Sequence, residues 1–451
     1  MDTKKPKKRG FQTPIGMHDI LPEEQRYYQK IFDIVENIAK FYGFEKIETP
    51  ILEEAELFSR GVGAATDIIE KQMFLLRTKG GDLLALRPEG TAPVARAYIQ
   101  NGMQNLPQPV KLWHAGPFFR YEHPQAGRYR QFWQFGFEAL GEQSPAIDAQ
   151  IIQIFYNILK ELKFSASARR RASYGGPAAA FGEGGKDLII EINSIGDNQC
   201  RPYFKKLLVS YFRHRESSLC SDCKRRLKTN PLRILDCKEE KCQRVKSQAP
   251  QIIDHLCEEC HNHFKEVLEL LDELGLPYHL NPYLVRGLDY YTKTVFEIVE
   301  ESQKGKILGT LAAGGRYDTL VKVLGGKETP GCGGAAGMER IIEVMKAKSP
   351  MSQKSPQAKV FLAQLGNIAK RKSLKLFEEF YQAKIPVSES FGRDSLKAQL
   401  RIADKLGVKF VLILGQKEAL DGTVIIKDMA SGRQETVKVE KAIREMKKRL
   451  K

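Results

Sequence analysis

The stretch FFRYEHPQAGRYRQFWQFGFEALG, residues 118 to 141, places charged and amide side chains where they could serve a binding cleft. Apolar and polar residues alternate on both sides of its turn-rich centre HPQAGR, which predicts an antiparallel hairpin. Side chains two positions apart share one face of a strand. The polar face predicted in this way carries Arg120, Glu122, Gln134, Gly136 and Glu138. It is either one wall of a site or an ordinary solvated face, because antiparallel sheets often meet water on one side.

A second candidate is RGLDYYTKTVFEIV, residues 286 to 299, in which an arginine and two tyrosines precede an apolar strand. A guanidinium keeps its charge at any ordinary pH, and its planar fork grips the oxygens of anions. Tyr290 or Tyr291 alone is more often part of a core than a ligand contact. Arg286 could also form a plain ion pair with Asp289. Both interpretations remain open on these residues alone.

A third candidate is the glycine-rich stretch GGKETPGCGGAAGMERIIEVM, where Gly331, Gly333 and Ala336 mimic a dinucleotide-binding fingerprint. No buried strand precedes it in a βαβ pattern, and no GK[ST] marks a phosphate loop. The glycines instead allow a backbone or a nucleotide to approach closely. The helix that follows carries Glu339 and Arg340 in its first turn, so Arg340 would be held rigidly beside the glycines.

Seven of the eight cysteines fall between residues 200 and 260. Two C-x2-C pairs in a chain without an export signal favour zinc over disulfides. We predict a structural zinc site with the ligands Cys220, Cys223, Cys257 and Cys260. The 33 residues between the pairs exceed the usual zinc-ribbon gap, and Cys237 and Cys242 lie within them. Reduced cysteines packed as small apolar residues are the alternative.

Lysine and arginine exceed aspartate and glutamate by 72 − 55 = 17, and this net charge would draw the chain toward polyanions such as nucleic acid. The same charge could serve solubility alone. No apolar run is long enough for a transmembrane helix. The N-terminus MDTKKPKKRG is basic but lacks the apolar segment of a signal peptide. We therefore expect a cytoplasmic protein without a membrane partner.

The elements change character along the chain. Residues 22–43 show helical spacing that ends at Gly43, and a strand is expected in FEKIETPIL. Residues 165–186 are rich in glycine, alanine and arginine, which predicts a flexible loop. Residues 197–276 are helix-rich and contain the cysteines, as an insertion between sheet-forming stretches would. After the linker-like KSPMSQKSPQ, strands and helices alternate as in a small α/β domain.

Taken together, the motifs resemble the histidyl-tRNA synthetases, which are class II aminoacyl-tRNA synthetases. The resemblance covers nearly the whole chain. It rests on the hairpin, RGLDYY, LAAGGRYDTLV and GMER, together with GMHDILPEE, ETPILEEAELFSRGVGAATDIIEKQMF, LRPEGTAPVARA and SLKAQLRIADKLG. Each block is a moderate signal, but their joint occurrence in this order is highly specific. RGLDYY with AAGGRYD is distinctive of the histidine enzyme within its class.

The resemblance implies an α+β fold with a six-stranded antiparallel catalytic sheet flanked by helices. The catalytic domain would comprise residues 1–196 and 277–347, interrupted by a helical insertion domain at 197–276. A linker at 348–357 would lead to an α/β anticodon-binding domain at 358–451. The implied enzyme is a homodimer that joins L-histidine to tRNA(His) through a histidyl-adenylate, with ATP as co-substrate and Mg²⁺ as cofactor.

The resemblance also implies roles for residues at matching positions. Arg120 and Arg340 would hold ATP, and Arg286 would sit between the substrate carboxylate and the α-phosphate. These three arginines are the predicted catalytic groups, and Arg120 and Arg286 also count as substrate contacts. The other implied substrate-binding residues are Glu89, Gly90, Thr91 and Gln134 around the amino group, Glu138 and Tyr291 at the imidazole, and Tyr290 and Tyr317 lining the pocket.

The sequence departs from the family pattern at the tip of the hairpin, and two alternative functions are compared with this interpretation. His123 stands at the hairpin tip where arginine is common, and Gln125 is the expected contact to the tRNA acceptor end. Glu89 follows a proline and could simply cap a helix. A non-catalytic paralogue, such as a regulatory subunit, is one alternative function. A zinc-dependent nucleic-acid-binding protein is another, but it leaves the polar hairpin face and RGLDYY unexplained.

Overall fold

The computed structural model describes residues 10–63, 66–124, 127–164, 187–301, 307–348 and 358–450. Contacts divide the chain into two compact units, Met1–Met351 and Ser352–Lys451. Each unit has its own sheet and its own apolar core. The loop expected at 165–186 and all but the first residue of the expected linker lie outside the described residues.

The first unit is built on an eight-stranded sheet. Its strands are β1 (Glu45–Lys46), β5 (Val110–Phe119), β6 (Gln131–Leu140), β7 (Asp187–Ser194), β8 (Tyr278–Leu280), β9 (Thr292–Glu301), β10 (Ile307–Arg316) and β11 (Gly331–Gly337). They run in the order β1-β5-β6-β11-β10-β9-β7-β8. The six strands from β5 to β7 in this order pair antiparallel throughout, which confirms the expected sheet. The short edge strands β1 and β8 pair parallel and extend this sheet on either side beyond the six strands that the resemblance implied.

The hairpin predicted from alternation is formed by β5 and β6, with Gly116 opposite Gln134. Phe135 and Phe137 are fully buried in the apolar core. Gln134 lines a pocket on the other side of the same strand. The period of two therefore separates the residues that hold the sheet from those that face the pocket.

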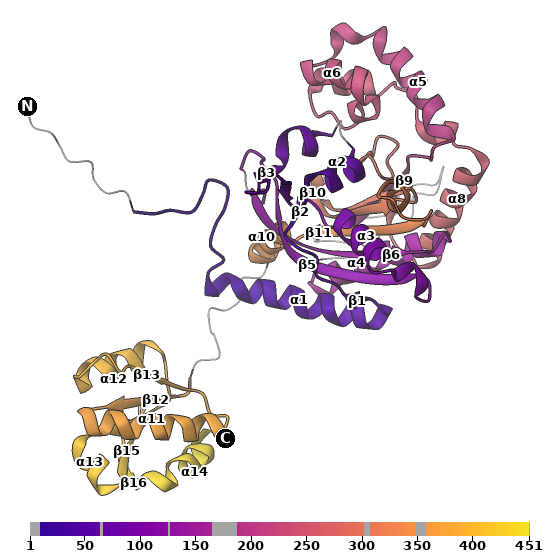
Figure 1. Ribbon diagram of the computed structural model, residues 1–451. Helices are drawn as coiled ribbons and strands as arrows, with labels where there is room; N and C mark the ends of the chain where they lie inside the picture. Colours follow the sequence, from indigo (N-terminus) through magenta and orange to yellow (C-terminus); the bar gives the residue numbers. More distant parts are fainter. Residues whose placement is uncertain are drawn as a thin grey trace, which may run out of the picture. The chain divides into compact units, whose positions relative to one another are not determined.

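One face of the sheet is covered by α1 (Pro22–Tyr42), α4 (Pro145–Glu161), α8 (Glu258–Glu273) and α10 (Met338–Lys348), whose apolar side chains share one core (Figure 1). Helix α1 ends at Gly43, which adopts the left-handed conformation that glycine tolerates best. The strand expected in FEKIETPIL is shorter than predicted and stops at Lys46. Pro50 has no backbone N–H with which to extend a ladder.

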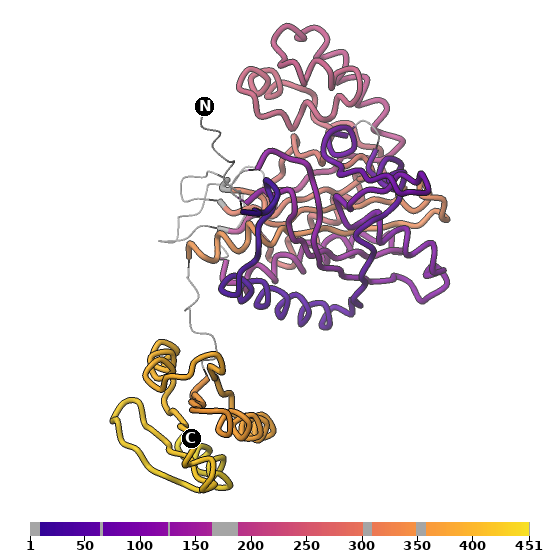
Figure 2. The backbone as a smooth tube through the Cα atoms, turned by 60° about the vertical axis from the view of Figure 1, so that its left-hand side comes forward, coloured from indigo at the N-terminus to yellow at the C-terminus, as the bar shows by residue number. Residues whose placement is uncertain are grey.

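The other face carries α2 (Ala55–Val62), α3 (Thr91–Gln100) and a small sheet of β2 (Leu52–Glu54), β3 (Phe74–Arg77) and β4 (Leu83–Leu86). Their core continues into the helix-rich insertion, which contains α5 (Cys200–Arg213), α6 (Ser221–Thr229) and α7 (Glu240–Lys246). Figure 2 shows these helices, in pink, projecting from the sheet. β8 then returns the chain to the sheet, as the sequence predicted.

The glycine-rich residues 331–337 form a central strand rather than a loop, with β6 and β10 as neighbours. A Cβ at Gly333 would overlap the carboxylate of Glu138, and one at Gly314 would overlap the carbonyl oxygen of Gly333. Close packing of backbone and side chain therefore requires glycine at these two positions.

The second unit is a five-stranded sheet with helices on both faces. Its strands are β12 (Val360–Gln364), β13 (Val387–Glu389), β14 (Phe410–Leu414), β15 (Thr423–Asp428) and β16 (Gln434–Lys438), in the order β13-β12-β14-β15-β16. Its helices are α11 (Asn367–Gln382), α12 (Leu396–Lys405), α13 (Gln416–Asp421) and α14 (Val439–Leu450). Leu362 and Phe361 enter separate cores on opposite faces. The expected α/β architecture is confirmed, although α13 was not predicted.

Within the described residues, no helix combines the length and apolar character needed to cross a membrane.

Candidate active site

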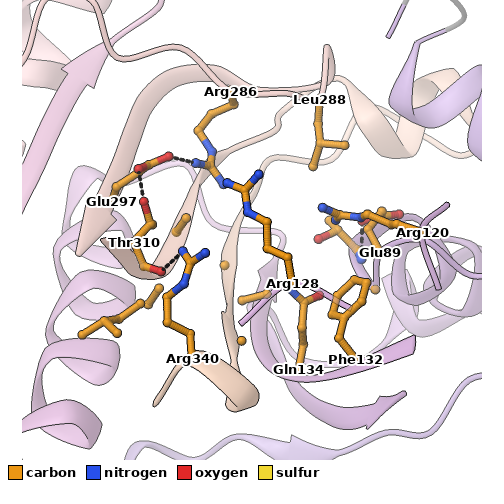
Figure 3. Close-up of a pocket in the computed structure, with 18 of the residues that line it drawn as sticks. Glu89, Arg120, Arg128, Phe132, Gln134, Arg286, Leu288, Glu297, Thr310 and Arg340 are labelled. Carbon is orange, nitrogen blue, oxygen red and sulfur yellow. Dashed lines mark hydrogen bonds and ion pairs between the residues drawn. The ribbon is translucent and has the colours of Figure 1, made fainter. Parts of the chain in front are cut away.

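A cavity of about 350 Å³ opens on the polar face of the large sheet. Segments far apart in the sequence meet around it: the turn before α3, the hairpin β5–β6, the loop from 286 to 291, the facing strands β9 and β10, and the start of α10 (Figure 3). Arg120, Arg286 and Arg340 all line this one cavity. The convergence on which the chemical interpretation depends is therefore present.

Arg286 is held by a carboxylate on β9. Its guanidinium pairs with Glu297, whose other oxygen accepts a hydrogen bond of 2.7 Å from the hydroxyl of Thr310. Burial alone would lower the pKa of Arg286, but Glu297, Tyr291 and Tyr290 together outweigh burial and raise it. Nε of Arg286 is buried and has no hydrogen-bond partner among the described residues. The Glu297 carboxylate therefore fixes the Arg286 guanidinium at the wall of the cavity.

Arg120 and Arg340 are anchored by backbone carbonyls rather than by carboxylates. Nε of Arg120 donates to the carbonyl of Pro88 at 2.8 Å, and Arg340 donates to the carbonyl of Thr310 at 2.8 Å. Burial lowers the pKa of both guanidinium groups. Both nevertheless stay charged, because arginine does not lose its proton in proteins. Their charge is incompletely compensated, which suits an anionic ligand.

Arg128, at the tip of the hairpin, brings a fourth guanidinium into the cavity. Figure 3 shows its side chain reaching toward Arg286, and its charge further lowers the pKa of Arg340. Such crowding of like charges costs energy unless an anion neutralises it. A ligand with several negative charges, such as a polyphosphate, fits this requirement.

Glu89 caps α3 and also faces the cavity. Its carboxylate accepts hydrogen bonds from the backbone N–H groups of Thr91 at 2.8 Å and Ala92 at 2.9 Å. The hydroxyl of Tyr290 donates to it at 3.2 Å. Burial raises the pKa of this carboxyl group. The capping role considered from the sequence is real, and it fixes a carboxylate at the wall of the cavity.

Glu138 lies behind the wall of the cavity. One of its oxygens accepts a hydrogen bond of 2.7 Å from Thr91, and the other accepts one from the hydroxyl of Tyr317. Glu138 and Tyr317 are almost fully buried. His114, 4% exposed, places Nε2 3.8 Å from Glu138, and that nitrogen has no hydrogen-bond partner in the described part of the chain. Sequence reasoning did not select His114, because it lies in an ordinary-looking strand.

The structure brings most of the predicted site residues together. Those that line the cavity are Glu89, Gly90, Thr91, Arg120, Gln134, Arg286, Tyr290, Tyr291 and Arg340. Glu138 and Tyr317 contact this group from behind. Gln125 lies outside the described residues.

Sequence reasoning also missed two charged residues of the lining: Glu297, which pairs with Arg286, and Arg128. Glu297 could have been found, since Phe296 and Ile298 are core residues and the residue between them must face the other way. Arg128 lies in a turn, where no periodicity indicates direction.

The four predicted zinc ligands do not lie together. The prediction of one site formed by Cys220, Cys223, Cys257 and Cys260 is therefore wrong. Cys220 and Cys223 gather with Cys237 and Cys242, whereas Cys257 and Cys260 gather with Asp197 and Cys200. The two C-x2-C pairs open different helices, α6 and α8, and each helix start faces a different chain segment. Sequence spacing alone could not choose between these pairings.

Comparisons with known proteins agree with this geometry. A family profile described as histidyl-tRNA synthetase matches residues 16–167 and 225–341, and one described as anticodon binding domain matches residues 359–449. A histidine–tRNA ligase of Dehalococcoides mccartyi is 42% identical over 98% of this chain and 100% of its own length. One of Desulforamulus reducens is 40% identical over 95% of this chain and 97% of its own.

The solved structures include a match of similar extent. The crystal structure of apo S. aureus histidyl-tRNA synthetase superposes with a TM-score of 0.73 at 32% identity, covering 96% of this chain and 99% of that one. Sequence relatives, family profile and fold agree over nearly the full length. The chain therefore belongs to the histidyl-tRNA synthetase family.

Proposed function

We propose that this protein attaches L-histidine to the 3′ end of tRNA(His) in two steps, with ATP as co-substrate and histidyl-adenylate as the intermediate. The observation that carries the proposal is the convergence of Arg120, Arg128, Arg286 and Arg340 on one cavity that also contains buried carboxylates. Cations suit the ATP phosphates and the substrate carboxylate, whereas carboxylates suit the amino group and ring nitrogen of histidine.

In the first step the histidine carboxylate attacks the α-phosphate and pyrophosphate leaves. Two anions must approach each other, and negative charge develops on phosphate oxygens during the attack. Arg286 would bridge both reactants, and the ion pair with Glu297, which fixes its guanidinium at the cavity, supports this role. Arg120 and Arg340 would hold the ATP phosphates. Fixed charges and positioning supply the acceleration, so the mechanism uses no side-chain nucleophile.

Histidine would be selected by the hydrogen-bonding groups at the wall of the cavity. Glu89, Thr91 and Gln134 would bind its amino group. Glu138 and Tyr291 would bind its imidazole, with Tyr290 and Tyr317 shaping the pocket. Thr91 and Tyr317 fix the Glu138 carboxylate behind the wall of the cavity, so the ring N–H would reach it past the lining residues. An amino acid without that N–H would forgo a hydrogen bond to a charged acceptor, which lowers its rate of activation.

The proposal extends to the metal ion, to the contacts with tRNA and to the assembly of the protein. Mg²⁺ would accompany ATP, and Glu122 and Glu297 offer the carboxylate oxygens that this ion prefers. The C-terminal unit would bind the anticodon arm of tRNA, and Gln125 would contact the acceptor end. The cytoplasmic location and the homodimer stay predictions. A regulatory, non-catalytic role is disfavoured, because the arginines of the cavity and the C-terminal unit are all present.

The decisive experiment measures ATP–pyrophosphate exchange with each of the amino acids in turn. We expect exchange with histidine alone. Glu138→Ala should lower histidine-dependent exchange by at least about a hundredfold, because the ring N–H loses its acceptor. Glu138→Gln keeps the volume of the side chain and should lower it in the same direction, which separates a lost contact from a collapsed pocket.

The control is Glu161→Ala, which removes an exposed carboxylate at the end of α4 and should leave exchange at the wild-type rate. Circular dichroism would report whether each variant folds. Wild-type exchange in folded Glu138→Ala, or exchange driven by another amino acid, would overturn the proposal.

A further inference from the structure

The insertion contains two compact sets of possible metal ligands. Cluster 1 consists of Cys220, Cys223, Cys237 and Cys242, and cluster 2 consists of Asp197, Cys200, Cys257 and Cys260. Within each cluster the four ligand atoms lie within 4.8 Å of one another. The clusters account for seven of the eight cysteines of the chain. We propose that each cluster binds one zinc ion, so that the chain carries two structural zinc ions.

The sulfur distances match a tetrahedral ion better than a disulfide. Zinc–sulfur bonds of about 2.3 Å in a tetrahedron separate neighbouring sulfurs by about 3.8 Å. The sulfurs of Cys200 and Cys260 are 3.7 Å apart, and those of Cys220 and Cys237 are 3.9 Å apart. A disulfide would require about 2.05 Å, and all eight cysteines are free. Thiolate ligands in a tetrahedron select zinc over harder divalent ions.

Backbone N–H groups point at the ligand atoms. In cluster 1 the N–H of Cys223 donates to the sulfur of Cys220 at 3.4 Å, and the N–H of Cys220 donates to the sulfur of Cys242 at 3.2 Å. In cluster 2 the N–H of Asp197 donates to the sulfur of Cys200 at 3.2 Å. Donors aimed at sulfur stabilise thiolates, the form that binds metal.

Each cluster also has positive charge beside it. Four anionic ligands around Zn²⁺ leave a net charge of −2 in a partly buried place. Arg226 and Lys246 interact electrostatically with cysteines of cluster 1. Arg201 and Lys293 interact with those of cluster 2. Arg226 also pairs with Asp67, and Lys293 also pairs with Glu259. Each cluster nevertheless has a cation beside the negative charge that zinc with four anionic ligands would leave.

Cluster 1 would brace a contact between the insertion and the cavity. Its residues surround the segment in which Arg226 pairs with Asp67 at 2.8 Å and Asn230 donates to Asp289 at 2.8 Å. Asp289 belongs to the loop that carries Arg286. Cluster 2 would tie the starts of α5 and α8 together where the insertion leaves and rejoins the sheet. Both ions would thus add cross-links to helices that the apolar core of the insertion already packs together.

The test is to measure the zinc content of the purified full-length protein by elemental mass spectrometry. We expect two zinc ions per chain in the wild type. The double variants Cys220→Ser/Cys223→Ser and Cys257→Ser/Cys260→Ser should each retain one. Cys332→Ala, which removes the buried cysteine outside both clusters, should retain two and serves as the matched control.

Asp197 gives a sharper test of cluster 2. Asp197→Ala should lower the zinc content to one, whereas Asp197→Cys should restore two by supplying a fourth sulfur. X-ray absorption on the wild type needs no variant, and we expect seven sulfur ligands and one oxygen ligand shared by two ions, with zinc–sulfur distances of about 2.3 Å. Zinc removal should increase hydrogen exchange in α5 to α7 and in the loop from 286 to 291.

Several results would overturn the proposal: no zinc or one zinc ion in the wild type, disulfides in place of free thiols, or two zinc ions retained by either double variant. None of these measurements depends on the aminoacylation activity. The metal sites can therefore fail while the proposed function stands, and the reverse also holds.

Discussion

Two groups of arginines around the same sheet differ in how many of their hydrogen-bond donors the protein itself occupies. Arg316, at the end of β10, is fully buried and bonds Asp148, also fully buried, at 2.7 Å. It also donates to Asp318 and to the backbone carbonyls of Glu142 and Ser144. Its guanidinium is saturated with protein partners.

The cavity arginines Arg120 and Arg340 are also substantially buried, yet each is anchored through one backbone carbonyl. Burial alone would raise the pKa of Asp148, but the charge and hydrogen bonds of Arg316 and His263 together outweigh burial and lower it. Arg120 and Arg340 form no ion pair with a carboxylate among the described residues, and the more distant carboxylates do not offset the burial that lowers their pKa values. The lesson is that free donors, rather than arginine as such, mark a ligand site.

The largest expected effect comes from breaking the saturated pair. Arg316→Ala leaves the buried Asp148 carboxylate with only the ring of His263, 3.2 Å away, so we expect the free energy of unfolding of the first unit to fall by about 3–5 kcal/mol. Urea unfolding followed by tryptophan fluorescence measures this change. The double variant Arg316→Met/Asp148→Leu should recover most of the loss, because no buried charge remains. An unchanged midpoint in Arg316→Ala would show that the pair is not structural.

The second-largest effect is expected from the removal of an arginine that lines the cavity. Arg286→Ala should lower kcat for histidine-dependent exchange by about 10² to 10³, as the loss of one transition-state donor does. Arg286→Lys should recover little of it, because an ammonium lacks the planar fork. Stability should change far less than in Arg316→Ala. The matched control, Arg60→Ala, removes an exposed arginine on α2. A stability loss equal to that of Arg316→Ala with normal exchange would erase the distinction between the two groups of arginines.

Much of the fold was accessible from local patterns. Alternation placed Phe135 and Phe137 in the core and Gln134 on the opposite face. Helical spacing and the glycine stop gave the end of α1 at Gly43. Both signals work because side-chain direction repeats within a single element.

The rest depends on how distant elements meet. No local signal separates Arg316 from Arg286, since both stand in glycine- and tyrosine-containing motifs, and only the position of Asp148 on α4 makes one of them saturated. The same limit explains the wrong zinc ligand set. Cys257 finds Cys200 only after the whole insertion has folded back. Family resemblance supplied the arginine roles, but it could not supply these pairings.

The smallest expected effect concerns Glu339, a buried carboxylate that precedes Arg340 in α10 and forms no ion pair within the described part of the chain. It accepts hydrogen bonds from Tyr28 at 3.2 Å and from the N–H of Trp133 at 2.8 Å. Burial raises its pKa from 4.5 to about 7. Below pH 4.5 both the folded and the unfolded chain hold this proton. As the pH rises toward 7 only the folded chain keeps it, so the stabilisation is lost progressively.

Glu339→Gln keeps the oxygen that accepts both hydrogen bonds and removes the titration. We expect the free energy of unfolding of the wild type to fall by up to about 3 kcal/mol more than that of Glu339→Gln between pH 4.5 and pH 8. Urea midpoints at these two pH values measure the difference, and other titrating groups cancel in the comparison. Parallel pH profiles would mean that Glu339 is ionised in the folded state. The absence of a counter-charge would then carry no energetic cost here, and the contrast with Asp148 would lose its physical basis.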